Sequence, residues 1–272
     1  MFNLIDSHVH LDHPRFDVDR PAVLASATDA GIVGMIVPAV DAASWPRIKA
    51  LSEDYPQVFP AFGLHPMYLG EHEPCDVDAL SSWLDDGNAV AVGELGLDFH
   101  LAELDPEQQR TYFVGQLQLA RERDLPVIVH ARSALEEVSL TLRRTGRLRG
   151  VVHSFSGSLQ QAQQLWTMGF HLGIGGPVTY PRAQRLRHIV AQMPIEFLLL
   201  ESDAPDQPDA DHRGERNEPA RINEILRCIA MLRDESETEL AAATTANARR
   251  LFDLDHHTRL KQERLNRKPT GP

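Results

Sequence analysis

The sequence predicts an α/β fold, a TIM-type (β/α)8 barrel. Eight short apolar runs alternate with segments of helical periodicity along the 272 residues. Strands this apolar are typical of a parallel sheet covered by helices, and eight repeats in a chain of this length favour a closed barrel. A doubly wound open sheet is the alternative, and it would place the strand ends in a crevice instead of a ring.

The predicted strands are short runs with a high content of β-branched residues. They cover residues 2–7, 33–39, 58–63, 89–93, 126–129, 150–152, 170–174 and 196–200. Helical spacing of apolar residues marks the segments between them, at 21–30, 47–54, 77–84, 106–123, 135–144, 159–168 and 182–192. Two further helices, 221–232 and 235–252, complete the outer ring. We therefore expect one catalytic domain over residues 1–254.

Composition excludes some classes of protein. Thirty-nine acidic against 27 basic residues give a net charge of -12, so no wide basic surface for nucleic acid is expected. The first residues lack a basic stretch, and Asp6, His8 and His10 interrupt any apolar run, which predicts a cytoplasmic protein without membrane contact. We expect a monomer. Residues 255–272 form a basic tail, predicted as a frayed helix with a disordered end.

Potential metal ligands stand at the ends of five of the eight predicted strands: His8, His10, Glu94, His130, His153 and Asp203. The loops after the strands of a barrel meet at one face, so these side chains are expected to share one mouth. In the first strand, residues two apart point to the same side, which directs Asp6, His8 and His10 together. Neutral imidazole is a common ligand, and Asp6 is expected to fix a tautomer. Solvated histidines at a capped strand end are the alternative.

Glu94 and Asp203 are the two carboxylates of this set. No arginine lies near Glu94 in the sequence, whereas a structural glutamate would normally pair with one, and its two oxygens suit two cations. Asp203 follows the last strand and is placed to bind a cation and to accept a proton from its water. Glu201, two residues earlier, is the competing base. Taken singly, His130 and His153 are also consistent with core histidines bonded to carbonyls.

Six motifs at the strand ends resemble the TatD family of metal-dependent deoxyribonucleases, which belongs to the amidohydrolase-like superfamily. They are IDSHVH (5–10), GLHP (63–66), VGELGLD (92–98), PVIVHAR (126–132), VHSFSG (152–157) and LESDAP (200–205). The segments QLQLA (116–120) and RGERNEP (213–219) extend the resemblance, which covers nearly all of residues 2–252. Two departures stand out: Asp206, Gln207 and Pro208 replace a frequent aromatic residue, and the loop 209–215 is unusually charged.

The resemblance implies a distorted barrel with two divalent cations. His8, His10 and Asp203 would hold one ion together with Glu94, while Glu94, His130 and His153 would hold the other. The donor set admits Zn, Mn, Ni or Fe, with Mg less natural among so many nitrogens. The implied activity is hydrolysis of phosphodiester bonds, as a 3′-5′ deoxyribonuclease on single-stranded DNA ends, and the partner is DNA or a small phosphodiester.

Catalytic roles are expected for Asp203, Glu94 and His65. Asp203 would take the proton of a cation-activated water, and His65 and Arg132 would hold the substrate phosphate by charge-assisted bonds. A turn histidine before Pro66 and a salt bridge from Arg132 to Glu136 are the respective alternatives.

Weaker candidates for substrate contacts lie on other loops. Arg213 and Arg216 are candidates for the nucleotide backbone, with pairs to Glu215 and Glu218 as the alternative. Three aromatic residues are candidates for base stacking, with core packing as the alternative: Phe99, Phe155 and Tyr180.

Two other functions fit the same residues. Hydrolysis of a carbonyl ester or cyclic amide is the first, because the same cations polarise a carbonyl equally well. A non-enzymatic, metal-stabilised binding protein is the second, and the complete ligand set argues against it.

Overall fold

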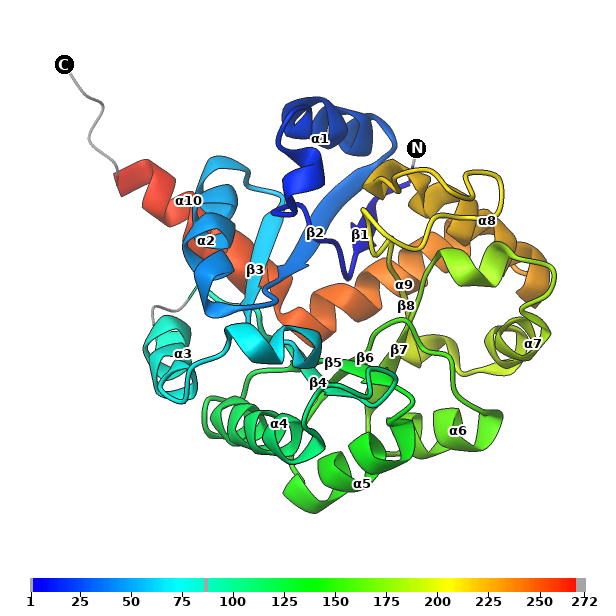
Figure 1. Ribbon diagram of the computed structural model, residues 1–272. Helices are drawn as coiled ribbons and strands as arrows, with labels where there is room; N and C mark the ends of the chain where they lie inside the picture. Colours follow the sequence, from blue (N-terminus) through cyan, green and yellow to red (C-terminus); the bar gives the residue numbers. More distant parts are fainter. Residues whose placement is uncertain (1, 86–87, 268–272) are drawn as a thin grey trace.

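Eight parallel strands, arranged in chain order, form a single curled sheet with helices outside it (Figure 1). A computed structural model describes residues 2–85 and 88–267. The strands are β1 (Leu4–Asp6), β2 (Ile32–Pro38), β3 (Val58–Phe62), β4 (Ala91–Asp98), β5 (Val127–Arg132), β6 (Gly150–Val152), β7 (Phe170–Ile174) and β8 (Leu198–Leu200). The predicted (β/α)8 barrel is confirmed.

The barrel closes between β1 and β8 through bonds made mostly beyond the ends of both strands. The Ser7 N–H and hydroxyl donate to the carbonyl of Leu200, at 3.0 and 2.9 Å. The Asp203 N–H then donates to the carbonyl of His8 at 2.9 Å. Because these bonds replace a longer strand ladder, the barrel is distorted at this seam, and the chain after β1 runs beside the chain after β8.

One helix follows each of the first seven strands and returns the chain to the next strand (Figure 1). These helices are α1 (Arg20–Asp29), α2 (Trp45–Asp54), α3 (Asp76–Asp85), α4 (Pro106–Glu122), α5 (Leu135–Thr145), α6 (Leu159–Thr167) and α7 (Gln184–Gln192). Side-chain caps start two of them: Ser158 and Gln161 form a capping box at α6, and Asp105 accepts from the Glu107 N–H at α4. Two helices that follow β8 are α8 (Ile222–Arg233) and α9 (Glu237–Phe252).

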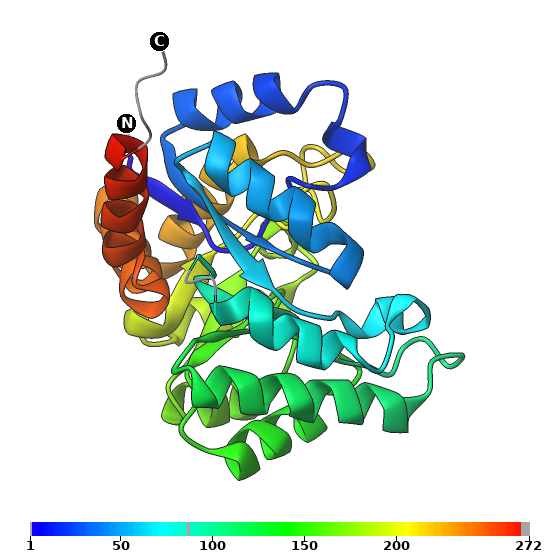
Figure 2. The same ribbon diagram turned by 90° about the vertical axis from the view of Figure 1, so that its left-hand side faces the viewer.

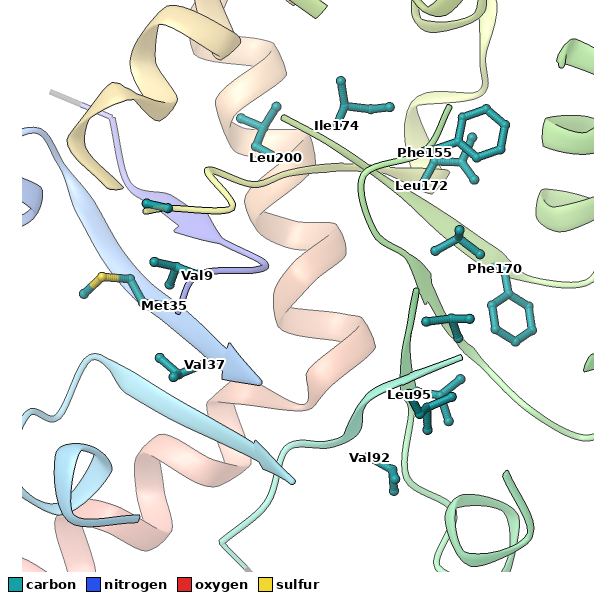
Figure 3. Packing of buried hydrophobic residues seen from close by; sticks show 14 of the residues in the cluster. Val9, Met35, Val37, Val92, Leu95, Phe155, Phe170, Leu172, Ile174 and Leu200 are labelled. Atoms are coloured by element: carbon teal, nitrogen blue, oxygen red, sulfur yellow. The ribbon is translucent and has the colours of Figure 1, made fainter. Parts of the chain in front are cut away.

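The strands separate two apolar layers because successive side chains point to opposite faces. Met35 and Val37 on β2 belong to the larger layer, between the sheet and the surrounding helices (Figure 3). Ile36, between them, belongs to a second cluster that includes Leu251 and Phe252 of α9. Figure 2 shows α9 packed at one end of the barrel. That end is therefore closed by apolar packing, and the opposite end is available for polar chemistry.

Strands β4 and β5 continue farther than the predicted runs 89–93 and 126–129. Glu94 and His130 consequently lie inside strands instead of directly after them. The pairing register shifts between Val92 and Leu95, after which β4 and β5 stay paired through Asp98 and Arg132. Gly96 permits this close approach, because its φ is +146° and a Cβ there would lie 2.0 Å from the carbonyl oxygen of His130.

The C-terminal segment is helical, as predicted for its first part, and this helix is held against the barrel. Residues Leu254–Arg267 form a helix, α10, whose first residue is buried. The Lys261 ammonium donates to the carbonyls of Ser52 (3.2 Å), Pro56 (3.3 Å) and Val58, and lies 4.6 Å from the centre of the Phe59 ring. The basic character of this segment was recognised from the sequence, but not that one of its cations binds carbonyls of α2, of β3 and of the turn between them. Residues 268–272 lie outside the described residues.

Within residues 2–85 and 88–267, no helix combines the length and the apolar character needed to cross a bilayer.

Candidate metal centre and active site

The predicted strand-end residues lie around one cavity of about 1290 Å³ at the open end of the barrel. His10, His65, Glu94, His130, His153 and Asp203 all line it, and His8 lies beneath them with no exposed surface. The structure therefore brings together every residue of the predicted ligand set. Six different strands, β1, β3, β4, β5, β6 and β8, or the residues just after them, contribute to it.

Glu94 stands at the centre, and its two oxygens face different histidines. Oε1 lies close to three ring nitrogens: His153 Nε2 at 2.7 Å, His65 Nε2 at 3.0 Å and His130 Nδ1 at 3.2 Å. Oε2 lies close to two others: His8 Nε2 at 3.2 Å and His10 Nε2 at 3.7 Å. The carboxylate thus joins two separate groups of nitrogen donors, one at each oxygen.

Within each group, two ring nitrogens point at the same space. His8 Nε2 and His10 Nε2 are 3.2 Å apart, and so are His130 Nδ1 and His153 Nε2. For nitrogen–metal bonds of about 2.0–2.1 Å at tetrahedral angles, two ligands of one ion lie roughly 3.4 Å apart. The donor spacing and the mixture of imidazole with carboxylate therefore fit divalent transition-metal ions.

The protonation of the cluster is set by burial and by Glu94. Burial lowers the pKa of His8 well below its usual value and that of His65 to about 4, which leaves both rings neutral. Neutral His8 is suited to metal binding, whereas His65, whose Nδ1 accepts from Met67, presents Nε2 as a hydrogen-bond donor. Burial opposes ionisation of Glu94, but the charges of the neighbouring histidines outweigh it and hold the Glu94 pKa well below its usual value. Burial likewise disfavours a charged His153, yet Glu94 beside it raises the His153 pKa to about 10. The ionised Glu94 carboxylate therefore stabilises positive charge placed beside it.

Asp203 completes the group on the Oε2 side of Glu94. Its Oδ1 lies 3.6 Å from His8 Nε2 and 3.8 Å from His10 Nε2. Its Oδ2 accepts a hydrogen bond from the side-chain amide of Gln207, whose own oxygen accepts from the Ser154 hydroxyl at 2.9 Å. Burial raises the pKa of Asp203. The carboxylate is held in a fixed orientation with one edge on the cavity.

Comparison with known proteins agrees with this geometry. The family model described as TatD related DNase matches residues 5–253. The chain belongs to the TatD family. It is 40% identical to the uncharacterized metal-dependent hydrolase YjjV of Escherichia coli (strain K12) over 92% of this chain and 98% of that protein. It is 35% identical to the 3′-5′ ssDNA/RNA exonuclease TatD of Salmonella typhimurium, over 92% of this chain and 99% of the relative.

Solved structures lead to the same family. The crystal structure of YjjV superposes with a TM-score of 0.89 at 39% identity, and covers 92% of this chain and 98% of its own. A dihydroorotase from Campylobacter jejuni superposes with a TM-score of 0.61 at 13% identity, over 93% of this chain and 84% of its own, which is a likeness of fold alone. TatD-family membership makes the protein a metal-dependent hydrolase acting on ester bonds.

Glu201, the competing base, lies behind the centre of this TatD-family site. It has no exposed surface and does not line the cavity. Its Oε1 accepts from the Ser154 N–H at 2.6 Å and lies 3.9 Å from His153 Nδ1. The bare backbone of Gly173 makes room for it, since a Cβ there would lie 2.0 Å from Glu201 Oε2. Burial raises the pKa of Glu201 to about 8.

The expected role of Asp6 is wrong. Its oxygens accept from the Ser202 N–H (2.9 Å), the Ser202 hydroxyl (2.5 Å) and the His8 N–H (3.2 Å), so it binds backbone and a hydroxyl instead of an imidazole. Asp6 thereby fastens the chain after β8 to β1. The carboxylate that does orient an imidazole is Asp98, whose Oδ2 lies 3.0 Å from His130 Nε2. Its sequence signal was a second acidic residue four positions after Glu94.

Two buried glutamines on α4 also escaped the sequence analysis. The Gln116 amide oxygen accepts from the Leu64 N–H at 2.8 Å, and its nitrogen donates to the Leu64 carbonyl at 3.1 Å. Gln109 makes the equivalent pair of bonds to the backbone of Asp98, at 2.8 and 2.9 Å. The two amides thus fix the backbone of Leu64, which precedes His65, and of Asp98, which contacts His130. Their signal was a polar residue in a buried helical position, repeated after seven residues.

Asn217 performs a similar task at the last strand. Its side-chain amide donates to the carbonyls of Ser202 (2.7 Å) and Asp206 (2.9 Å). It thus holds the turn that carries Asp203, which gives a structural reason for the asparagine in the motif at 213–219.

His65 is a turn residue and part of the cluster at the same time. Its Nδ1 accepts from the Met67 N–H at 3.0 Å, and His72 Nε2 lies 2.9 Å from its carbonyl oxygen. These contacts direct Nε2 toward Glu94. Arg132 is exposed on the cavity, and within the described part of the chain it forms no ion pair with Glu136.

Of the remaining residues predicted to contact substrate, only Phe155 lines the cavity. Arg216 is bound by Asp19 at 2.8 and 2.7 Å and by Glu218 at 2.8 Å, so it holds loops together, whereas Arg213 is exposed away from the cavity lining. Phe99 packs beneath Arg110, and the Tyr180 hydroxyl donates to the Pro208 carbonyl at 3.1 Å. Phe155 lines the cavity although it is buried.

The cavity also carries two partly exposed apolar side chains that the sequence analysis did not single out, Met67 and Tyr68.

Proposed function

We propose that this TatD-family hydrolase removes nucleotides from the 3′ end of single-stranded DNA. The observation that carries the proposal is Glu94, a buried carboxylate whose two oxygens face two separate groups of imidazoles on the floor of one open cavity. Relatives 35% identical to this chain are 3′-5′ ssDNA/RNA exonucleases, which supports the substrate class and the direction.

Two divalent cations fit the donors. His8, His10 and Asp203 would hold one ion, His130 and His153 would hold the other, and Glu94 would contribute to both. Two such cations would lower the pKa of a water toward neutrality and stabilise charge that develops on a phosphodiester oxygen. Zn, Mn, Ni and Fe suit this donor set better than Mg.

The protein's own groups then have distinct tasks. Asp203 would take the proton of the attacking water, since unlike Glu201 it lies on the cavity, and unlike Glu94 it faces only one group of imidazoles. His65 and Arg132 bind the phosphate from the β3 and β5 sides, Arg132 by the paired donors of its guanidinium. Gln207 keeps the Asp203 carboxylate in the productive orientation.

The position of the site favours chain ends. The donors lie inside a ring of loops, and an intact duplex about 20 Å wide cannot lower its backbone into such a mouth without unpairing. A single strand can enter by its end. The net charge of -12 also gives the protein little with which to hold a long duplex.

The test is a comparison of circular and linear single-stranded DNA of the same sequence, incubated with the protein and each of Zn, Mn, Ni, Fe and Mg. We expect digestion of the linear strand from its 3′ end, an intact circle, and no reaction with a chelator. Rapid linearisation of the circle would refute end-directed cleavage. Hydrolysis of aryl esters or cyclic amides without any DNA cleavage would refute the phosphodiester substrate.

A further inference from the structure

Charge is distributed unevenly around the mouth of the cavity. Besides Glu94 and Asp203, its acidic lining residues are Asp12, Asp41 and Asp206, which follow β1, β2 and β8. The arginines are Arg132, at the end of β5, and Arg182 and Arg185, in the segment after β7 and the first turn of α7. In Figure 1, α1 and α2 lie across the barrel from α5, whereas α7 is next to α8. Although the protein is acidic overall, three arginines therefore line one part of its active-site mouth.

These three arginines differ from most others in the chain because their charge is not neutralised. Within residues 2–85 and 88–267, none of them forms an ion pair, whereas Arg47, the remaining arginine of the cavity, is paired with Asp17. Arg185 donates one hydrogen bond, to the carbonyl of Ser156 at 2.8 Å, and Arg182 lies 5.6 Å from the centre of the Tyr180 ring. Both contacts orient a guanidinium without cancelling its charge.

We propose that Arg182 and Arg185 form a binding site for the phosphate backbone of a single strand, upstream of the nucleotide that is cleaved. The inference rests on the proposed function. Guanidinium groups bind phosphate oxygens by two parallel hydrogen bonds. With Arg132 they line the β5–β7 side of the mouth, whereas Asp12 and Asp41 follow β1 and β2 and repel phosphate; Asp206 is ion-paired with Arg15 at 3.2 Å. A strand whose 3′ end reaches Glu94 therefore leaves the cavity past Arg182 and Arg185, away from Asp41.

The test is the affinity of Arg182→Ala/Arg185→Ala for a 5′-labelled oligothymidylate with phosphorothioate linkages, which slow hydrolysis, measured by fluorescence anisotropy on the metal-loaded protein. The salt slope is the slope of log binding constant against log salt concentration, and each phosphate contact on a single strand contributes about 0.7 to it, so two lost contacts should lower it by about 1.4. The wild type should bind the strand about sevenfold or more tightly than the variant at 50 mM salt. This ratio of affinities should fall about sevenfold between 50 and 200 mM salt.

Strand length and charge provide two internal checks. The loss should be large for a ten-nucleotide strand and much smaller for a dinucleotide, whose single phosphodiester lies at the point of cleavage and leaves none for the arginines. Arg182→Lys/Arg185→Lys should recover part of the salt slope, because the charges return. The matched control is Arg143→Ala/Arg144→Ala, which removes the same charge from two exposed positions on α5 that do not line the cavity.

Two results would overturn the inference, and they are distinguishable. If the wild type binds and trims the strand, and Arg182→Ala/Arg185→Ala keeps the same affinity and salt slope as the α5 control, the arginines hold no backbone. If the wild type neither binds nor trims any strand, the proposed function fails and this inference fails with it.

Discussion

Replacing Asp98 by asparagine should weaken one of the two proposed metal positions and spare the other. Asp98 has no exposed surface, its backbone is held by Gln109, and its Oδ2 lies 3.0 Å from His130 Nε2. The opposite nitrogen of that ring faces Glu94 and His153. A carboxylate behind a ligating histidine raises its basicity, and losing it costs about 10–100-fold in metal affinity, or about 1.4–2.7 kcal/mol.

The assay is a competition titration with a chromophoric chelator, which yields two dissociation constants for a protein that holds two ions. In Asp98→Asn we expect one constant to rise by about 10–100-fold and the other to change by less than about threefold. Asp124→Asn, an exposed substitution far from the site, is the matched control. Equal weakening of both positions, or no weakening of either, would refute the assignment of Asp98 to His130 alone.

Three further predictions concern the proton acceptor, a buried carboxyl and the C-terminal helix. Asp203→Asn should keep the fold and lose nearly all hydrolysis, because an amide cannot take a proton, whereas normal turnover there beside an inactive Glu201→Gln would reverse the assignment. In chelator-treated protein the Glu201 pKa is about 8, above its unfolded value of 4.5, so the folded protein binds this proton more tightly than the unfolded chain does. The stabilisation from this proton is complete below pH 4.5 and is lost as the pH rises through 8. Glu201→Gln should therefore gain stability relative to the wild type between pH 5 and pH 9 in denaturant titrations, and a constant difference would contradict this. Lys261→Met strips three carbonyls of their donor and should cost about 2 kcal/mol, seen as a fall of about 4–8 °C in Tm, while the exposed Arg259→Ala should cost almost nothing. Equal Tm values for these two variants would show that α10 is not fastened by Lys261.

Strand positions and the gathering of the ligand set could be predicted from sequence because both depend on local patterns. Apolar runs locate the strands, and parallel strands in a barrel end at one face, so side chains at those ends meet whatever the loops between them do. His8 and His10 illustrate this: they lie just after β1, at the face where the strands end, and their Nε2 atoms are 3.2 Å apart.

Partnerships between distant segments could not be predicted in the same way. Asp6 was expected to orient a histidine, but the chain after β8 offers Ser202 to it, a contact across 196 residues. Gln116 contacts Leu64 across 52 residues, and Lys261 reaches carbonyls more than 200 residues away. Each is a hydrogen bond whose partner becomes known only once the barrel has closed, and no periodicity or composition records it.

Anomalous diffraction from crystals grown with Mn²⁺ tests directly whether Glu94 joins two metal positions, because it locates ions without reference to activity. We predict two separate peaks, one on each side of the Glu94 carboxylate, the first beside His8 and His10 and the second beside His130 and His153. A single peak, or peaks that do not touch Glu94, would contradict the claim that this carboxylate joins two metal positions.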